Sequence, residues 1–331
     1  MSEKHEHVSV LALNPAVDIS YEIPQLLEYQ KVRASKTLYH PGGNGINIAR
    51  ALTELAIPAN CCSIIAGESG DLLLNLLGDT LDDRHKWFRV QGETRLNTTI
   101  LQHSPPGQYE ITSVGPEIPS DVLAEVCNCM LEKAGSGIGV LSGLLPPGVP
   151  ESTYREMVER INKQGGKAVV DTHGEVLQLA IEAKPWLVRI NRHILEMSMK
   201  RRMDTARDVA EAARTIQQRG IAYVCVTLGQ EGAVLVDADN SYHCDAPKVH
   251  KQSTVGCGDS VVSGLVASAL KGEAPQQMLR YGVVCASATS SHPGTELFRR
   301  CLLYTSPSPR DCNEYRVCRL LLDKGGGGGG G

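Results

Sequence analysis

Short apolar runs alternate with longer amphipathic stretches along most of the chain. The apolar runs are VSVLAL, CCSIIAG, IGVLSG, KAVVDTH, WLVRIN and YVCVTLG, and the amphipathic stretches include GINIARALTELA, LLLNLLGDTL, VLAEVCNCMLEKA, TYREMVERINKQG and DVAEAARTIQQRG. Such apolar runs have the length of buried strands, whereas apolar positions three and four residues apart form one face of a helix. The alternation predicts an α/β fold with a mainly parallel sheet, whose binding site lies at the carboxyl ends of the strands.

Two segments interrupt this alternation, YEIPQLLEYQKVRASKTLYH and LNTTILQHSPPGQYEITSVG. Polar and apolar residues are interleaved in both, around turn residues such as those of the SPPG stretch, as in antiparallel strands with one exposed face. We therefore expect residues of about 19–40 and 95–114 to assemble away from the main sheet as a small β-sheet lid. That lid would close over the carboxyl edge of the main sheet.

The composition is that of an ordinary globular protein, with 42% hydrophobic and 21% charged residues and a formal net charge of −4. Without a long run of one charge, binding to nucleic acid or to an anionic membrane surface is not expected. No apolar stretch is long enough for a membrane span, and MSEKHEHVSVLALN carries charges where a signal peptide needs an apolar core. A cytoplasmic location is expected.

The eleven cysteines are scattered, and no CxxC pair occurs. Cys127 and Cys129 fall in a helical pattern, where residues two apart point to different faces, so a shared metal is not expected. Buried free thiols in a reducing cytosol are the interpretation that this pattern favours.

The last thirty-one residues, 301–331, end in seven glycines and continue none of these patterns. A glycine tract has no side chains to bury, so this tail is expected to be disordered. Because CLLYTSPSPRD resembles translated sequencing-adapter sequence, the tail is also open to interpretation as an artefact, which an independent clone would test.

A helix that starts among glycines carries an acid in its first turn, within STVGCGDSVVSGLVASALKG, residues 253–272. Gly256 and Gly258 let a ligand approach the backbone N–H groups that the first helical turn leaves without partners, which makes an anion hole. Asp259 beside this hole is either the N-cap of the helix or a group that acts on a bound ligand.

A second glycine cluster, HPGGNGINIARAL, lies about two hundred residues upstream and also precedes a helical pattern. Ile48 stands where the last glycine of GxGxxG would be, so a dinucleotide-binding dehydrogenase loses support. Gly42 and Gly43 leave a backbone that a polar ligand can approach, and Asn47 offers it a donor and an acceptor, although a tight turn with a structural asparagine is the alternative. In LNPAVD, Asp18 follows the first strand, where it either binds sugar hydroxyls or belongs to an Asx turn.

Five motifs in a fixed order, LNPAVD, PGGNGIN, SGLLPPG, VTLGQEGA and QSTVGCGDS, resemble the ribokinase-like (PfkB) family of carbohydrate kinases. The resemblance runs from about residue 8 to 298 and is strongest for the hexose-phosphate branch, which includes phosphofructokinases and tagatose-6-phosphate kinases. It implies a ribokinase-like three-layer α/β/α kinase domain over residues 8–300, with residues 301–331 outside it. It also implies a homodimer that forms through the lid.

The same resemblance implies a site. Asp259 would be the general base, with the backbone of Gly256, Cys257 and Gly258 around the transferred phosphoryl group, and ATP with Mg²⁺ would be the donor, with no protein residue assigned as a metal ligand. The residues implied for sugar-phosphate binding are Asp18, Lys31, Arg33, Gly42, Gly43, Asn47, Arg95 and Ser142. Those implied for the nucleotide are Asn191, Thr227, Gly229, Gly232, Ser253 and Gly258.

Three basic residues in the lid favour a phosphorylated sugar, because bidentate arginine suits a phosphate; solvated cations on exposed strands are the alternative. We therefore predict a kinase of a ketohexose phosphate, with fructose 6-phosphate converted to fructose 1,6-bisphosphate. Fructose 1-phosphate and tagatose 6-phosphate are alternative substrates. From another class, a non-catalytic sugar-phosphate sensor is a further alternative.

The sequence departs from the family at four positions. The usual Lys-Pro-Asn reads Arg189-Ile190-Asn191, and Ile194 replaces a glutamate linked to the magnesium and phosphate network, for which Glu196 is not expected to substitute. Cys257 replaces the usual alanine, which would make the activity sensitive to oxidation if the helix terminus favours its thiolate.

Overall fold

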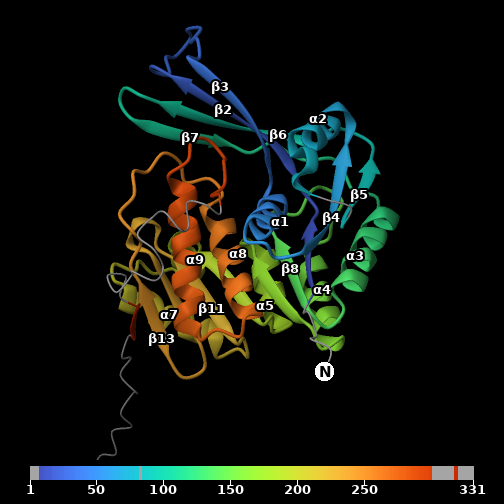
Figure 1. The fold of residues 1–331 in the computed structure, drawn as a ribbon, viewed down its shortest axis with the longest axis vertical. Coiled ribbons are helices and arrows are strands. Elements are labelled where there is room, and N and C mark those ends of the chain that lie inside the picture. The colour runs from blue at the N-terminus through green and yellow to red at the C-terminus, as the bar shows by residue number, and fades with distance from the viewer. Residues whose placement is uncertain (1–6, 82–83, 300–316, 320–331) are drawn as a thin grey trace, which may run out of the picture.

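The computed structural model describes residues 7–81, 84–299 and 317–319 of the chain. They form a large ten-stranded sheet flanked by helices and a separate four-stranded sheet that projects over one end of it (Figure 1). No helix among these residues is long and apolar enough to cross a membrane.

The large sheet is parallel over seven adjacent strands and antiparallel at one end. Its order is β14-β13-β12-β11-β10-β9-β8-β1-β4-β5. The parallel strands are β1 (Val8–Ala12), β4 (Ala59–Ala66), β5 (His85–Val90), β8 (Ile138–Ser142), β9 (Lys167–Asp171), β10 (Leu187–Asn191) and β11 (Tyr223–Thr227). The antiparallel ones are β12 (Ala233–Val236), β13 (Ser241–Cys244) and β14 (Val317–Arg319).

Helices cover both faces of this sheet, which gives the three layers that the sequence predicts. They are α1 (Asn44–Glu54), α2 (Gly67–Leu77), α3 (Ser120–Ala134), α4 (Thr153–Lys163), α5 (Gly174–Glu182), α6 (Arg192–Met199), α7 (Ala206–Gln217), α8 (Cys257–Leu270) and α9 (Pro275–Ser290), with short 3-10 turns at Gly78–Thr80 and Gly229–Glu231. Successive residues of β1 point to opposite faces. Val10 packs in a core with α1, α2, α8 and α9, whereas Leu11 packs in another with α3 to α7.

The lid is the four-stranded sheet, in the order β3-β2-β6-β7. Its strands are β2 (Ala16–Ile23), β3 (Lys36–Gly42), β6 (Arg95–Gln102) and β7 (Gly107–Ile111). β2 with β3 and β6 with β7 form antiparallel pairs, but the two central strands, β2 and β6, run parallel. The expectation of a wholly antiparallel lid is therefore wrong, because the long connection between β2 and β6 passes through the main sheet and returns in the same direction.

The main strands and helices that the hydrophobic pattern predicts are all present. The tail is the exception, since residues 317–319 form β14 and pair with β13, so the expectation of disorder over 301–331 is wrong there. β13 would otherwise expose a row of unpaired backbone groups, which favours the addition of a strand. The remainder of the tail prediction lies outside the described residues.

Candidate active site

Four adjacent parallel strands carry polar side chains at their carboxyl ends. Ser142 ends β8, Asp171 ends β9, Asn191 ends β10 and Thr227 ends β11. The registers of these strands place Ser142 opposite Asp171 and Asn191 opposite Thr227. The carboxyl edge therefore presents a continuous row of hydrogen-bonding groups beneath the start of helix α8.

Asp259 lies in the first turn of α8 and is buried. Its two carboxylate oxygens accept hydrogen bonds of 2.9 Å from Nδ2 of Asn44 and Nδ2 of Asn47, both on helix α1. The N-cap of α8 is instead Gly256, in the left-handed region at φ 77°. Asp259 is therefore not the N-cap, and Asn47 is not a turn residue but the partner of this acid.

The electrostatic surroundings of Asp259 bring its pKa into the neutral range. Burial raises the pKa to about 7, and the nearby Asp171 carboxylate adds to this shift, whereas Asn47, Asn44 and the Arg189 guanidinium lower it. A base with such a pKa is present in both protonation states at neutral pH, which suits proton transfer.

The glycines before α8 have separate roles. Gly256 supplies the positive φ at the start of the helix. At Gly258 a Cβ atom would lie 2.5 Å from both terminal nitrogens of Arg189, so only glycine lets this guanidinium pack against the helix start. The first-turn N–H groups and a buried cation therefore face the same small region.

Cys257 sits between these glycines and is partly buried. Burial and the neighbouring Asp259 carboxylate raise its pKa to about 12, and the opposing effects of Arg189 and Lys251 are smaller. Burial therefore opposes the thiolate on which the predicted oxidation sensitivity of Cys257 depends.

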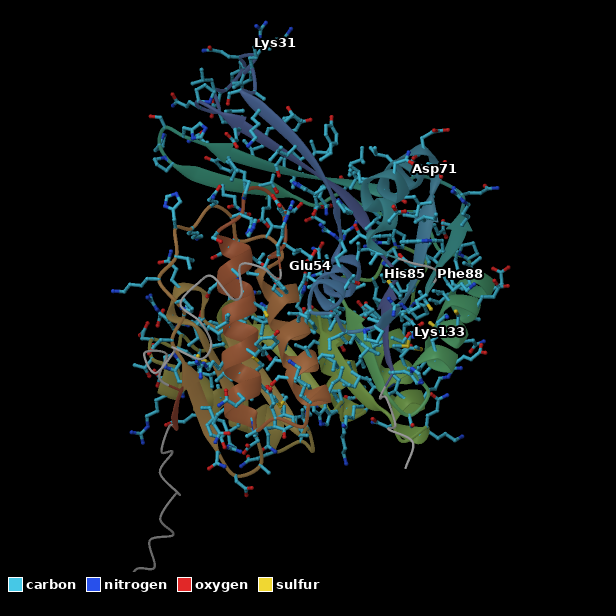
Figure 2. All side chains as sticks on the ribbon, viewed as in Figure 1. Lys31, Glu54, Asp71, His85, Phe88 and Lys133 are labelled. Carbon is cyan, nitrogen blue, oxygen red and sulfur yellow. The ribbon has the colours of Figure 1, made fainter. Side chains whose placement is uncertain are left out.

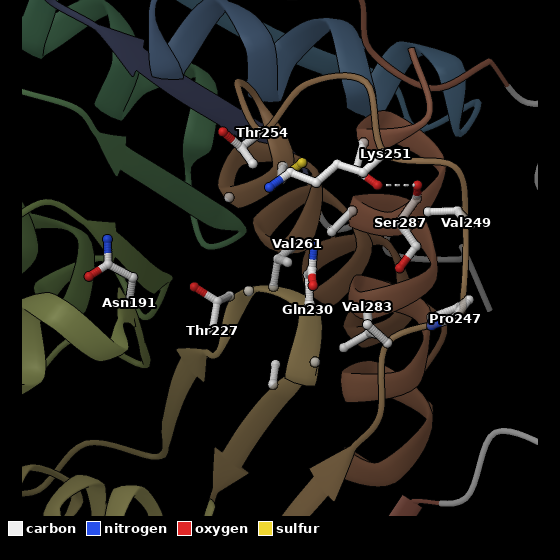
Figure 3. A pocket seen from close by; sticks show the side chains of 18 of the residues that line it. Asn191, Thr227, Gln230, Pro247, Val249, Lys251, Thr254, Val261, Val283 and Ser287 are labelled. Carbon is white, nitrogen blue, oxygen red and sulfur yellow. Dashed lines mark hydrogen bonds between the residues drawn. The ribbon is translucent and has the colours of Figure 1, made fainter. Parts of the chain in front are cut away.

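A cavity of about 570 Å³ opens beside the start of α8 (Figure 3). Asn191 and Thr227 lie on one side of it, and Pro247, Val249 and Val283 lie on the other. A polar end and an apolar end suit a nucleotide, with its phosphates near Gly258 and its base among the aliphatic side chains.

Five of the six residues predicted for the nucleotide line this cavity: Asn191, Thr227, Gly229, Gly232 and Gly258. Asn191 also caps helix α6, where its Oδ1 accepts a hydrogen bond of 2.8 Å from the N–H of Ile194. Ser253 is buried and accepts a hydrogen bond of 3.2 Å from the N–H of Val255, so it shapes the loop before α8.

The predicted sugar-binding acid, Asp18, belongs to lid strand β2 rather than to a loop after β1. Its carboxylate accepts a hydrogen bond of 2.9 Å from Asn97 on β6, and a Cβ at Gly42 would lie 2.1 Å from it. Arg50 connects it to the surroundings of Asp259, since this guanidinium donates to Oδ1 of Asn47 at 3.4 Å and interacts electrostatically with Asp18. Burial raises the pKa of Asp18.

The residues predicted to bind the substrate's phosphate are dispersed within one chain. Lys31 and Arg33 are exposed in the connection between β2 and β3, and Lys31 lies at the outer tip of the lid (Figure 2). Arg95 is buried and donates to the carbonyl oxygen of Asn14 at 2.9 and 3.1 Å. Ser142 donates to Asp171 at 3.3 Å.

Sequence reasoning missed Asn44, Asn97 and Asp171. Asp171 carried a usable signal, because it directly follows the apolar run of β9 at the carboxyl edge. Glu196 is the acid nearest in sequence to Ile194, which replaces the family's glutamate. Its side chain accepts a hydrogen bond of 2.8 Å from the N–H of Met203 and so stabilises the loop after α6.

Comparisons with known proteins agree on one family. A family model described as pfkB family carbohydrate kinase matches residues 10–299. The ATP-dependent 6-phosphofructokinase isozyme 2 of Escherichia coli K12 is 32% identical over 292 residues, which cover 88% of this chain and 94% of that protein. The 1-phosphofructokinase of the same strain is 31% identical over 288 residues, which cover 86% and 91%.

Solved structures agree with these matches. The crystal structure of phosphofructokinase-2 from Escherichia coli in complex with substrates and products has a TM-score of 0.84 and 31% identity, over 89% of this chain and 96% of that one. A ribokinase from Thermotoga maritima, at 18% identity and a TM-score of 0.73 over 90% and 98% of the two chains, shares the fold. The dehydrogenase alternative is left without support. With the family model spanning nearly the whole described chain, this protein belongs to the pfkB family of carbohydrate kinases.

Proposed function

We propose that this enzyme transfers the γ-phosphoryl group of ATP to a fructose phosphate, with fructose 6-phosphate as the substrate and fructose 1,6-bisphosphate as the product. The pairing of Asp259 with Asn47, beside the open N–H groups of α8, carries this proposal. The names of two relatives, a 6-phosphofructokinase and a 1-phosphofructokinase, support a fructose phosphate.

In the proposed step, Asp259 takes the proton of the sugar hydroxyl as its oxygen bonds to the γ-phosphorus. The bond from that phosphorus to the β,γ-bridging oxygen breaks, and ADP leaves with the electron pair. The N-terminal amides of α8 stabilise the charge on the transferred group. Asn44 and Asn47 hold the carboxylate by its two oxygens, so its orientation is fixed before substrate binds.

Magnesium on the nucleotide would neutralise part of the phosphate charge, and it requires only one or two carboxylates besides phosphate and water. Asp171 lies buried at the strand ends near Asp259, but its carboxylate is already paired with Arg189 at 3.2 Å, so the metal would be held by the nucleotide phosphates and water, with no protein residue assigned as its ligand. The chain therefore suits a metal that arrives with ATP.

We further propose that two copies pair through their lids in the cytosol. Apolar side chains remain exposed on the lid strands, namely Tyr39, Leu96, Tyr109 and Ile111. Lys31 and Arg33, exposed in the connection between β2 and β3, would then reach the partner's sugar-phosphate site. The cysteines in the described part of the chain are all free thiols, which is in keeping with a reducing compartment.

A coupled assay for ADP release with fructose 6-phosphate, fructose 1-phosphate and tagatose 6-phosphate tests the proposal. We expect the highest kcat/KM for fructose 6-phosphate and a loss of about 10²- to 10⁴-fold in Asp259→Asn, the usual contribution of a general base. Preference for another sugar phosphate would correct the substrate. If wild type and Asp259→Asn bind sugar phosphate equally and neither transfers a phosphoryl group, the protein is a sensor.

A further inference from the structure

Arg189 is a buried arginine at the meeting point of the two halves of the site. It comes from β10, and its side chain is 13% exposed. It lines the nucleotide cavity, while its terminal nitrogens pack against Gly258 at the start of α8. The guanidinium thus lies next to the amides that receive the transferred group.

Two neighbours hold this guanidinium in place. One terminal nitrogen donates to Asp171 at 3.2 Å, and the other donates to Thr227 at 2.9 Å. Asp171 in turn accepts a hydrogen bond of 3.3 Å from Ser142. The network therefore runs across the ends of β8, β9, β10 and β11, from the predicted sugar-phosphate side to the predicted nucleotide side.

The donors of Arg189 are not used up by these two bonds. A guanidinium has five N–H groups, and the structure gives partners to two of them, while Nε is buried with no hydrogen-bond partner. Buried polar groups that lack a partner in a protein generally find one in water or in a ligand. The terminal nitrogens have hydrogens left for an anion in the cavity beside them.

The negative charge around this part of the site also favours a cation that faces a ligand. Asp171 and Asp259 are both buried near Arg189, and a polyphosphate would add further negative charge to the same small region. Lys251, on the rim of the cavity, is exposed and therefore screened by solvent. Arg189 is the buried cation at this point among the residues that line the cavity.

We propose that Arg189 is a further catalytic residue, whose guanidinium contacts the phosphoryl group in transfer beside Gly258, and that Asp171 and Thr227 are the positioning residues that hold it there. The proposal rests on the proposed phosphotransfer function. A fixed, desolvated guanidinium that receives charge as it develops is an effective way to stabilise a phosphoryl transition state. Its planar shape allows two parallel bonds to phosphate oxygens, which lysine at this position cannot make.

The test compares Arg189→Lys and Arg189→Met with wild type in two measurements. Steady-state kinetics give kcat, and calorimetric titration gives the affinity for ADP and for the non-hydrolysable ATP analogue AMP-PNP. We expect Arg189→Met to lower kcat by about 10²- to 10³-fold. It should weaken AMP-PNP binding at least tenfold while ADP binding changes less than threefold, and Arg189→Lys should recover part of both losses.

Arg214→Lys is the matched control, because Arg214 is also a partly buried arginine with backbone partners, but it serves the β12–β13 turn, where it donates to the Asn240 carbonyl at 2.7 Å. It should leave kcat and both affinities within threefold of wild type. If Arg189→Met does not fold, because Asp171 is left without its counter-ion, the double variant Asp171→Asn with Arg189→Met removes the pair as a unit. It should fold and show the same selective loss of AMP-PNP affinity.

Three results would overturn the proposal: an unchanged kcat in Arg189→Met, equal weakening of ADP and AMP-PNP, or the same losses in Arg214→Lys. The titrations also separate this proposal from the proposed function. If wild type transfers no phosphoryl group to any sugar phosphate, the proposed function fails, whereas the AMP-PNP to ADP affinity ratio still decides whether Arg189 contacts the terminal phosphate.

Discussion

Asn47 and Asp259 are 212 residues apart in the chain, and the amide of the first donates to the carboxylate of the second at 2.9 Å. This bond fastens helix α1, which follows the lid strand β3, to helix α8, which carries the anion hole. The acid is therefore fixed to both the lid side and the predicted nucleotide side of the site, as the proposed transfer between two ligands requires.

The pH dependence of activity should report this acid. Because the carboxylate form acts as the base and burial raises its pKa to about 7, kcat/KM should rise with pH and level off above neutrality. Asn44 lowers this pKa by its hydrogen bond, so Asn44→Ala should move the midpoint of the rise to higher pH. Rate profiles between pH 5.5 and 9 measure the shift.

Asn162→Ala controls for the loss of an amide, since Asn162 is exposed and donates to the Ala183 carbonyl away from the site. Its pH profile should coincide with that of wild type. A midpoint that stays in place in Asn44→Ala, or that moves to lower pH, would contradict the assignment of Asp259 as the titrating base.

Stability should change in the opposite direction to activity when Asp259 is neutralised. The folded protein holds a proton on Asp259 up to about pH 7, whereas the unfolded chain releases it near the ordinary aspartate pKa of 3.8, so wild-type stability falls as pH rises between these values. Asp259→Asn has no carboxyl group that must stay protonated, so its stability does not fall in this way as pH rises. At pH 8 we expect its free energy of unfolding to exceed that of wild type by about 1–3 kcal/mol, after the loss of one amide hydrogen bond.

Urea unfolding at pH 8 and pH 4 measures this difference. The gain should shrink toward zero at pH 4, where wild-type Asp259 is already protonated in the folded state. A variant that is less stable than wild type at pH 8 would mean that the carboxylate, in spite of its burial, contributes favourably to folding.

The sequence indicated the fold and much of the site because both rest on local patterns. Buried strands read as apolar runs, and their carboxyl ends fall where Ser142, Asn191 and Thr227 stand. The glycine clusters before two helical patterns singled out Asp259 and Asn47, which are neighbours in the structure, and the resemblance to a known family added Ser142, Asn191 and Thr227 as candidates.

What could not be predicted depends on contacts between distant segments. Asn44 points at Asp259 only because α1 packs against α8, and the parallel pairing of β2 with β6 depends on the path of the chain between them. Arg189 stood out in the sequence as a departure from the family, yet its place beside Gly258 follows from the packing of β10 under α8. Side-chain direction at such positions has no signature in local periodicity.

Cys257 should resist alkylation in spite of its place at a helix N-terminus. With its pKa raised to about 12, the thiolate is about one part in 10⁴ or less at pH 7.5. We expect iodoacetamide to modify Cys257 at least a hundredfold more slowly than free glutathione under the same conditions. Mass spectrometry of timed digests gives the rate for this residue, and a rate equal to that of glutathione would restore the oxidation-sensitive interpretation.

Gly258→Ala should damage the site through Arg189 rather than through the helix. The new Cβ would lie 2.5 Å from both terminal guanidinium nitrogens, so Arg189 has to move away from Asp171 and Thr227. Overpacking of this kind costs about 1–3 kcal/mol of stability. A displacement of about 1 Å in a catalytic group can lower kcat by about 10²-fold.

Gly107→Ala provides the matched control, because a Cβ at this exposed lid position meets no atom closer than 3.8 Å and the backbone φ is not in the left-handed region. Its stability should stay within about 0.5 kcal/mol of wild type, as is usual for surface substitutions. Thermal unfolding and kcat are measured for both variants. If Gly258→Ala retains wild-type kcat and loses only stability, the helix start tolerates a displaced guanidinium, and the close packing of Arg189 on Gly258 serves the fold rather than the transfer step.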